Sequence, residues 1–310
     1  MNSEPSWDLY RTFLAALREA SLSGAARRLG LTQPTVSRHI DALEEALDQA
    51  LFVRTQRGLS PTDAALALRP YAETLASTSA ALLRAVSGRP GEIAGTVRIT
   101  ASEVVGVEVL PPILVNLRAQ HPRLDLEVVL SNAVDDLLRR DADVAIRMVE
   151  PTQDALVARR AGTIRVGLHA HRHYLERRGT PAAPAELAGH DLIGFDRERP
   201  ELREVLGRYP GLERTRFGFR ADSDLAQLAA IRAGFGIGVC QTPIARRDPD
   251  LVPVLQDWFA LDLPAWIVMH EDMRSTPRCR AVFKALAAGL AAHAGSGQDP
   301  AQGMPDPGAA

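Results

Sequence analysis

The chain has 310 residues, 46% of them hydrophobic and 24% charged, and its formal net charge is −2. Two cysteines exclude a disulfide framework and a four-cysteine zinc module. A nearly neutral chain cannot attract nucleic acid through an overall positive charge, so such binding would depend on where individual basic residues lie. The chain starts without a signal-like segment and has no apolar run of about 20 residues, so we expect a cytoplasmic protein without a membrane helix.

The first part of the chain predicts three short helices. Residues 7–17 place apolar side chains at helical spacing, and residues 24–29, capped by Ser23 and ended by Gly30, form a second helix. Thr32 opens a third helix with a proline in its first turn. Two helices joined by a tight glycine turn make a helix-turn-helix, although a plain helical bundle shows the same spacing.

A hairpin follows the third helix. Residues 51–54 and 59–62 have the pattern of short strands around a turn at residues 55–58. This is a hairpin with two arginines, Arg54 and Arg57, at its tip, which is the form of a wing. The first turns of the third helix, residues 32–39, contain no acidic residue, whereas its last part contains four. A recognition helix meets bases with its N-terminal residues, so the acid-free part suits the major groove.

The stretch AARRLGLTQPTVSRHI at residues 25–40, followed by LEE at 43–45 and LFVR at 51–54, resembles the N-terminal domain of LysR-type transcriptional regulators. The resemblance implies a winged helix-turn-helix domain over residues 1–62. It also implies that polar and basic residues face double-stranded promoter DNA: Gln33, Pro34, Thr35, Ser37, Arg38, Arg54 and Arg57. Arginine can pair with guanine or phosphate, and glutamine can pair with adenine. For the hydroxyl groups of Thr35 and Ser37, the alternative explanation is that they face water on the helix surface.

Three positions depart from the family pattern. Ala20, Asp48 and Ala65 stand where the family usually has glycine. Aspartate tolerates the left-handed backbone of a helix end better than most residues other than glycine. We expect these departures to affect local packing and to leave DNA binding intact.

Residues 63–90 predict a linker helix that Thr62 can cap. Its apolar seam has coiled-coil spacing, with three leucines seven residues apart, although a helix packed on its own chain has the same pattern. The proline at position 70 is expected to bend the helix. The resemblance implies that the helix pairs subunits of a homodimer or homotetramer through one set of residues: Leu68, Tyr71, Leu75 and Leu82.

From residue 95 onward strands and helices alternate, which predicts an α/β region with an open, mostly parallel sheet. A helix is expected at 134–140 between two of the strands. The resemblance implies a two-lobed, periplasmic-binding-protein-like effector domain over residues 91–294. Lobe one would cover about 91–163 and 267–294, and lobe two about 164–266. The tail at 295–310, rich in glycine and proline, is expected to be disordered.

Ligands of open sheets bind beyond the carboxyl ends of strands. This rule selects a set of polar residues that follow predicted strands: Ser102, Ser131, Asn132, Arg147, Asp222, Ser223, Gln241 and Thr242. Ser102 and Ser131 could cap helices whose N–H groups attract an anion, and the resemblance places effector contacts there, although plain capping explains both. The neighbouring Glu103 disfavours an anion. We expect a small polar metabolite, with carboxylates among the candidates.

Three histidines, His169, His171 and His173, would share one face of a strand, as a zinc or nickel site requires. A helix that begins before Tyr174 would separate them, and we predict neither a metal nor another cofactor.

No motif of a hydrolase, a phosphate-binding loop or a zinc protease occurs, so we predict no enzyme. The leading interpretation is a DNA-binding transcription regulator that is controlled by a small-molecule effector. The alternatives are a regulator that acts through oligomer assembly alone, and a cytoplasmic small-molecule-binding protein or enzyme without a role at DNA.

Overall fold

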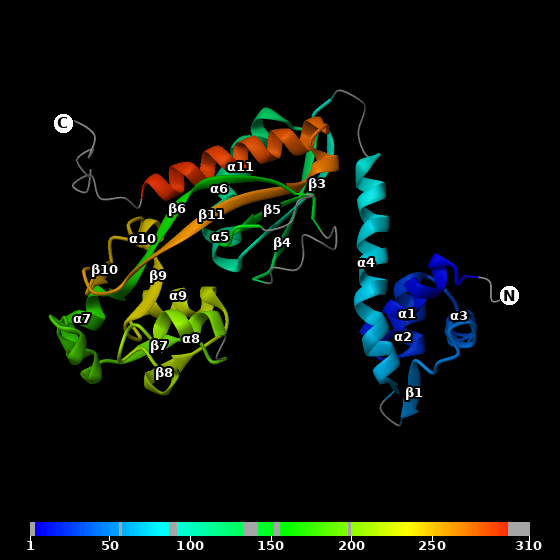
Figure 1. The fold of residues 1–310 in the computed structure, drawn as a ribbon, viewed down its shortest axis with the longest axis horizontal. Helices are drawn as coiled ribbons and strands as arrows, with labels where there is room; N and C mark the ends of the chain where they lie inside the picture. The colour runs from blue at the N-terminus through cyan, green and yellow to red at the C-terminus, as the bar shows by residue number, and fades with distance from the viewer. Residues whose placement is uncertain are drawn as a thin grey trace, which may run out of the picture. The chain divides into compact units, whose positions relative to one another are not determined.

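The computed structural model describes residues 4–55, 58–86, 92–132, 142–151, 156–197 and 200–296. These residues form two compact units, an N-terminal unit that ends at Val86 and a C-terminal unit that begins at Glu92 (Figure 1). Within the described ranges, no helix is long and apolar enough to cross a membrane. Residues 297–310 of the predicted tail, the predicted helix at 134–140 and Arg57 lie outside the described residues.

The N-terminal unit has the predicted order of three helices, a hairpin and a long helix. Phe13, Val36 and Leu43 have no exposed surface and form the centre of its core. The hairpin is antiparallel, with Phe52 opposite Pro61. The elements are α1 (Trp7–Glu19), α2 (Leu22–Leu29), α3 (Gln33–Leu47), β1 (Phe52–Thr55), β2 (Gly58–Pro61) and α4 (Asp63–Ala85).

One predicted helix start is wrong. The N-cap of α2 is Ser21, whose Oγ accepts a hydrogen bond of 3.0 Å from the backbone N–H of Gly24. Ser23 lies inside the helix, because the chain turns into helical backbone directly after Ser21. The predicted end at Gly30 is confirmed, with a left-handed φ of 67°.

Two of the three departures from the family pattern lie in left-handed backbone. Ala20 ends α1 with φ 47°, and Asp48 ends α3 with φ 49°. Each conformation costs a residue other than glycine on the order of 1 kcal/mol. Ala65 differs from both, because it is fully buried within α4, where helical backbone suits alanine.

The long helix α4 starts after Thr62, whose Oγ1 accepts a hydrogen bond of 3.2 Å from the N–H of Ala65. It continues without a break through Pro70. The Thr74 hydroxyl donates a bond of 2.9 Å to the Pro70 carbonyl.

The C-terminal unit is built on a seven-stranded sheet with the order β10-β6-β11-β5-β3-β4, and β9 also pairs with β6. A separate two-stranded sheet joins β7 and β8 in parallel. The strands are β3 (Gly95–Ala101), β4 (Leu124–Leu130), β5 (Val144–Arg147), β6 (Leu156–His171), β7 (Leu192–Gly194), β8 (Phe217–Arg220), β9 (Gly238–Gln241), β10 (Leu251–Val254) and β11 (Ala260–His270).

Helices cover this sheet from several segments of the chain. The longest, α11, packs on β6 and α6, and α5 packs on α9. The helices are α5 (Glu103–Glu108), α6 (Leu110–Gln120), α7 (Arg172–Arg178), α8 (Pro200–Leu206), α9 (Asp224–Arg232), α10 (Thr242–Ala245) and α11 (Pro277–Gly295), and the short 3-10 turns are Pro184–Gly189, Arg214–Arg216 and Glu271–Met273.

The prediction of a mostly parallel sheet is wrong for the seven-stranded sheet. Among its described strands, only β3 pairs in parallel, with β4 and β5, while β6, β9, β10 and β11 all pair antiparallel. The cause is the long pair β6 and β11, which run side by side in opposite directions along much of the unit (Figure 1). Alternation of strands and helices in the sequence does not reveal this returning strand.

The register of β6 and β11 changes between Ala265 and Trp266, opposite Gly162 and Arg160. Gly162 has φ 150°, and a Cβ at this position would lie 2.7 Å from the Cβ of Ala294. Only glycine therefore fits here. The irregularity occurs where the sequence predicts the chain to cross between lobes, and the lobe boundaries themselves stay a prediction.

Candidate nucleic-acid interface and effector site

The predicted recognition helix α3 is anchored on one side and open on the other. Val36, Ile40 and Leu43 are buried in the core of the N-terminal unit. On the other side Gln33, Pro34 and Arg38 are exposed, and Thr35 and Ser37 are half-buried. Buried residues at helical spacing thus fix the orientation of α3 and leave its N-terminal turns open.

Hydrogen bonds within the protein limit what two of these residues offer to a partner. The Thr35 hydroxyl lies 2.8 Å from the hydroxyl of Thr32, which caps the helix. The amide oxygen of Gln33 accepts a bond of 3.0 Å from the Ser23 hydroxyl. This bond orients the Gln33 amide and leaves its nitrogen as the group that can donate to a base.

Arg38 is exposed on the first turns of α3. Within the described part of the chain no carboxylate pairs with it, in contrast to Arg28, which lies 3.2 Å from Glu19. The guanidinium of Arg38 therefore keeps all its donors for a partner outside the protein.

One acidic residue of α3 has a role that the sequence did not reveal. The Glu44 carboxylate accepts bonds of 2.6 Å and 3.0 Å from the backbone N–H groups of Leu51 and Phe52. It thereby ties the first strand of the hairpin to the recognition helix. A glutamate eight positions before a strand is no recognisable motif, so only the structure shows this contact.

The hairpin has the place expected of a wing. Arg54 lies on β1 opposite Leu59 and is exposed. The N–H of Leu59 donates a bond of 2.8 Å to the carbonyl of Ala20, which holds β2 against the end of α1. Arg54 is therefore presented from a strand that is fixed to the helical core.

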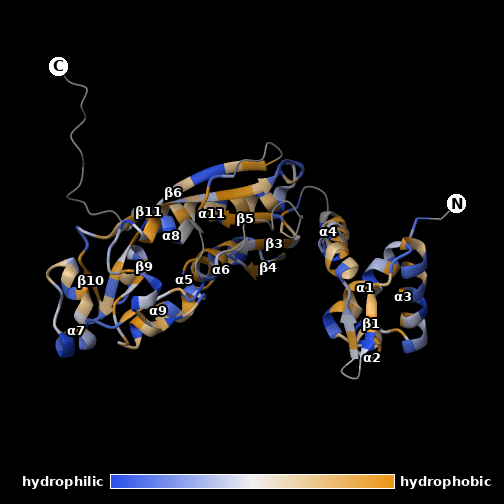
Figure 2. Cartoon of the chain, turned by 60° about the horizontal axis from the view of Figure 1, so that its bottom comes forward, coloured by the Kyte–Doolittle hydropathy of each residue, from blue (hydrophilic) through white to orange (hydrophobic). Residues whose placement is uncertain are grey.

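Along α4 hydrophobic residues recur, as the hydropathy colours show (Figure 2). Leu68 is half-buried against the core of the N-terminal unit, whereas Tyr71, Leu75 and Leu82 are 72%, 46% and 65% exposed. Three of the four predicted dimerisation residues thus form an apolar surface that the described residues leave uncovered.

In the C-terminal unit, the carboxyl ends of β3 and β4 lie together. The N–H of Ser131 donates a bond of 2.9 Å to the carbonyl of Ala101, and the N–H of Glu103 donates one of 3.2 Å to the side-chain oxygen of Asn132. Ser102 occupies the N-cap position of α5, but its hydroxyl makes no capping bond. The structure therefore brings Ser102, Ser131 and Asn132 together.

The segment after β8 meets this group from the other part of the unit. The Ser223 hydroxyl donates a bond of 2.6 Å to the Glu103 carboxylate. The Asn132 amide lies 3.5 Å from the Asp224 carboxylate. These contacts place Ser223 beside Ser102 and Asn132, as expected from the strand-end rule, and add Glu103 and Asp224 to the site.

The remaining predicted effector residues have other partners. Arg147 is buried, and its guanidinium donates to the Ile146 carbonyl at 2.9 Å. Gln241, also buried, makes a bond of 2.9 Å with His293 on α11. Asp222 pairs with Arg197 at 3.2 Å. Thr242 is the first residue of α10.

An ion-pair network that the sequence did not reveal ties α5 to α9. Both carboxylate oxygens of Glu108 accept bonds from Arg232, at 2.6 Å and 3.0 Å. The bond from Arg232 holds the pKa of Glu108 below its usual value. Arg232 also lies 3.5 Å from Asp248, and Arg247 donates a bond of 2.9 Å to the Glu108 carbonyl. Paired, partly buried charges of this kind fix the contact between the two helices.

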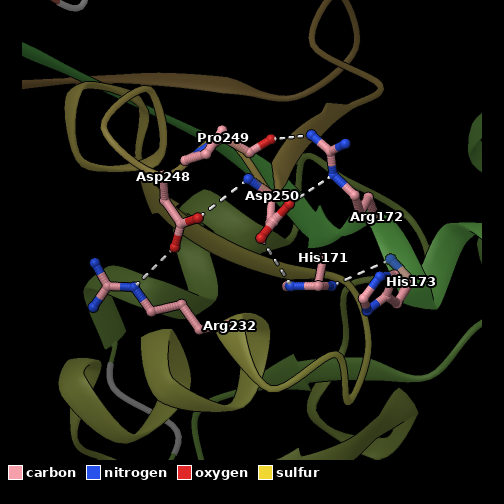
Figure 3. A network of polar contacts seen from close by, with 7 residues as sticks. All are labelled: His171, Arg172, His173, Arg232, Asp248, Pro249 and Asp250. Carbon is pink, nitrogen blue, oxygen red and sulfur yellow. Dashed lines mark hydrogen bonds and ion pairs between the residues drawn. The ribbon is translucent and has the colours of Figure 1, made fainter.

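The same network continues toward the histidine segment (Figure 3). The N–H of Asp250 donates a bond of 3.2 Å to Asp248, and the Asp250 carboxylate lies 2.8 Å from Arg172 and 3.9 Å from His171. The ring of His173 stacks at a tilt on that of His171, with centroids 4.9 Å apart. These residues form a solvent-facing set of ion pairs at the end of β6.

The three histidines do not share a strand face. His171 ends β6 and His173 lies in α7, while His169 is buried, 3.0 Å from the Gly167 carbonyl and 3.4 Å from the Cys240 sulfur. Burial lowers the pKa of His169 and raises that of the Cys240 thiol to about 12. Within the described residues no group of three histidine, cysteine or acidic side chains could hold a metal ion.

Two family profiles match the chain. The profile of the LysR substrate binding domain matches residues 90–291, and that of the bacterial regulatory helix-turn-helix proteins of the lysR family matches residues 7–66. Among curated relatives, an HTH-type transcriptional regulator of Xanthomonas campestris pv. campestris (strain 8004) is 31% identical over 187 residues, which is 60% of this chain and 54% of that protein. The probable HTH-type transcriptional regulator LtrA of Klebsiella pneumoniae is 25% identical over 300 residues, 94% of this chain and 96% of that protein.

Solved structures share the fold. The structure of CbnR, a LysR family transcriptional regulator, covers 93% of this chain and 99% of its own at 19% identity, with a TM-score of 0.66. A structure of CbnR complexed with its target DNA covers 94% of this chain and all of its own, also at 19% identity, with a TM-score of 0.58. The two profiles together span most of the sequence, in the order of the two units. The chain therefore belongs to the LysR-type transcriptional regulators, with a helix-turn-helix DNA-binding domain followed by an effector-binding domain.

Proposed function

We propose that this regulator binds double-stranded promoter DNA in the cytoplasm as a homodimer or homotetramer, and that a small polar effector controls its binding or the bending of the DNA. The observation that carries the proposal is the open N-terminal surface of α3, where exposed Arg38 has no ion-pair partner among the described residues. A charged, unpaired guanidinium on a rigidly anchored helix is prearranged for a base edge or a phosphate.

The other predicted DNA contacts would act around Arg38. Gln33, held by Ser23 through its amide oxygen, would donate its amide nitrogen to a base acceptor. Ser37 and Pro34 would lie along the sugar-phosphate backbone of the DNA. Thr35 would act mainly by stabilising the start of α3, and Arg54 and Arg57 would bind phosphate groups from the wing. The fold is that of CbnR, whose structure was solved with its target DNA.

Pairing of subunits would place two such helices on DNA. The exposed apolar residues of α4, Tyr71, Leu75 and Leu82, have no cover within the described chain and suit a second copy of the same helix. A pair of recognition helices about 34 Å apart would match half-sites one turn of DNA apart. Replacing Leu75 with arginine should therefore produce monomers in sedimentation velocity, whereas unchanged dimers would contradict this role of α4.

The effector would be held where the ends of β3 and β4 meet the segment after β8. Ser102, Ser131, Asn132 and Ser223 offer hydroxyl and amide groups there, and Asp222 is the second residue after β8. Arg147 ends β5, Gln241 ends β9 and Thr242 begins α10, and we retain them as residues that support the site. The Glu103 carboxylate within the group favours a ligand that donates hydrogen bonds.

A mobility-shift experiment tests the proposal. We expect the protein to retard DNA from upstream of its own gene more strongly than a scrambled duplex of equal length, with steep weakening as salt increases because phosphate contacts dominate affinity. Equal binding to both duplexes would contradict a sequence-specific regulator. Thermal-shift titration with metabolites, on the wild type and on the double variant Ser102→Ala, Ser131→Ala, tests the effector site. A shift that persists in the double variant would contradict its placement.

A further inference from the structure

A pocket of about 230 Å³ lies in the C-terminal unit beside α8. Its apolar lining comes from Phe195, Leu206, Leu212 and Phe217. Leu212 and Phe217 are buried and belong to a hydrophobic core that also contains Phe259. Two walls of the pocket are thus fixed by a packed core. The volume is below the roughly 300–1,000 Å³ typical of sites for drug-sized ligands, so it suits a small molecule.

Basic side chains line the same pocket, namely Arg197, Arg203 and Arg214. Arg214 is held on one edge by Asp196, whose carbonyl accepts from Nε and whose carboxylate accepts from Nη2 at 2.8 Å. This leaves Nη1 of an oriented guanidinium without a partner among the described residues. Arg197, by contrast, pairs with Asp222 and has an 83% exposed side chain. Arg214 is therefore the donor whose geometry suits a ligand, and Arg203 on α8 lines the pocket beside it.

One carboxylate, that of Glu213, also lines the pocket. One of its oxygens accepts a bond of 3.0 Å from the backbone N–H of Gly211. This bond lowers the pKa of Glu213, so the group is charged at neutral pH. The Glu213 side chain is exposed, so its carboxylate can also accept a bond from a donor on a ligand.

Groups of both charges around an apolar pocket select a ligand that carries both charges and an apolar group. We propose that this pocket binds an α-amino acid with an apolar side chain. Arg214 would hold its carboxylate from a pocket wall that Arg203 also lines, Glu213 would hold its ammonium group, and the two phenylalanines and two leucines would surround its side chain. A plain carboxylate would leave Glu213 facing an anion, and a plain amine would leave the arginines unmatched.

Isothermal titration of the full chain with three related probes tests the ligand class. L-phenylalanine carries both charges, 3-phenylpropanoate lacks the ammonium group, and 2-phenylethylamine lacks the carboxylate. We expect phenylalanine to bind, and each analogue to bind at least about tenfold more weakly because it lacks one charge-assisted contact. No saturable binding of phenylalanine, or equal binding of 3-phenylpropanoate, would overturn the proposal.

Variants assign the contacts to residues. Glu213→Gln should weaken the binding of phenylalanine about tenfold and abolish its advantage over 3-phenylpropanoate. The double variant Arg203→Gln, Arg214→Gln should weaken both acids. Arg208→Gln is the matched control, because Arg208 lies just after α8, pairs with Glu204 at 2.8 Å and does not line the pocket. Thermal melting like that of the wild type confirms that each variant is folded. Unchanged phenylalanine binding in the Glu213 and arginine variants, or an equal loss in the control, would overturn the assignment.

Discussion

The two units present their predicted functional residues in different ways. On α3 the residues expected to read DNA come from one helix, and Arg38 and Gln33 face outward from a buried opposite side. In the C-terminal unit the residues expected to hold an effector come from separate strand ends and already have partners within the protein, as Ser223 has in Glu103. The proposed DNA surface is therefore open in the free protein, whereas a ligand at the proposed effector site would have to replace existing hydrogen bonds.

This difference concerns energy as well as geometry. A partner of α3 displaces only water from exposed groups, so each good contact adds to affinity. A ligand that displaces the bond of 2.6 Å between Ser223 and Glu103 must offer a donor to the carboxylate, or leave it unsatisfied. In the proposed function, this exchange of hydrogen bonds is the step by which the effector would alter the geometry of the C-terminal unit.

The largest expected effect tests whether the two units are separate. Phe13 has no exposed surface, and its ring centroid lies 5.7 Å from that of Phe52. Phe13→Ala should destabilise the N-terminal unit by about 3–5 kcal/mol, because it leaves a cavity in a small core. Amide hydrogen exchange should show lost protection up to Val86 and unchanged protection from Glu92 onward. The matched variant Ile146→Ala, in the C-terminal core, should do the reverse, and loss of protection throughout in either variant would show a single cooperative unit.

The next effect concerns the open surface of α3. Arg38→Ala should cost about 1–3 kcal/mol of binding free energy on the specific site if Arg38 reads a guanine. Fluorescence anisotropy on the specific duplex and on duplexes with single base changes measures this loss. Arg28→Ala is the control, because Arg28 is already paired with Glu19. A loss of equal size on every duplex would instead identify Arg38 as a phosphate contact.

The third prediction concerns acid sensitivity of the C-terminal unit. Burial lowers the pKa of His293 from 6.5 to about 4. Between pH 6.5 and about 4, His293 is therefore protonated in the unfolded chain but neutral in the folded chain. The contribution of His293 to the free energy of unfolding is complete above pH 6.5 and decreases as the pH drops toward about 4. His293→Gln should flatten this fall in denaturant unfolding measured across that range, while an unchanged pH profile would contradict the role of His293. The effect is moderate because the ring is only partly buried.

The smallest effects are in the helix ends of the N-terminal unit. Ala20→Gly and Asp48→Gly should each stabilise the protein by up to about 1 kcal/mol, because both positions have left-handed backbone. Ala65→Gly should instead destabilise it by about 1 kcal/mol, since the residue lies within α4. Thermal unfolding of the three variants checks these signs. A gain in stability for Ala65→Gly would show that helix propensity does not govern that position.

The N-terminal unit was predictable almost residue by residue. Its caps at Thr32 and Thr62 and its helix end at Gly30 depend on local hydrogen bonds and backbone angles, and the structure confirms them. The start of α2 was wrong by two residues because two serines close together can both act as caps, and only the backbone decides between Ser21 and Ser23. The contact between Glu44 and the wing was missed because its partners are backbone N–H groups, which almost every residue has.

In the C-terminal unit the sequence predicted most elements and the meeting of Ser102, Asn132 and Ser223, because strand ends in such folds lie close together. It did not predict the antiparallel run of β6 along β11, which joins segments about a hundred residues apart. It also gave no sign of the charged lining around Glu213 and Arg214, whose polar residues belong to no motif.

By itself the sequence determined the elements whose causes are local, namely the caps, turns and helical faces, together with the family of the protein. The tertiary structure alone decided strand direction, the ion pairs of Arg232 with Glu108 and Asp248, and the partners of the effector-site residues. The physical reason is distance along the chain. Local structure follows from the angles and hydrogen bonds of neighbouring residues, whereas these pairs form only when the packing of the whole unit brings distant segments together.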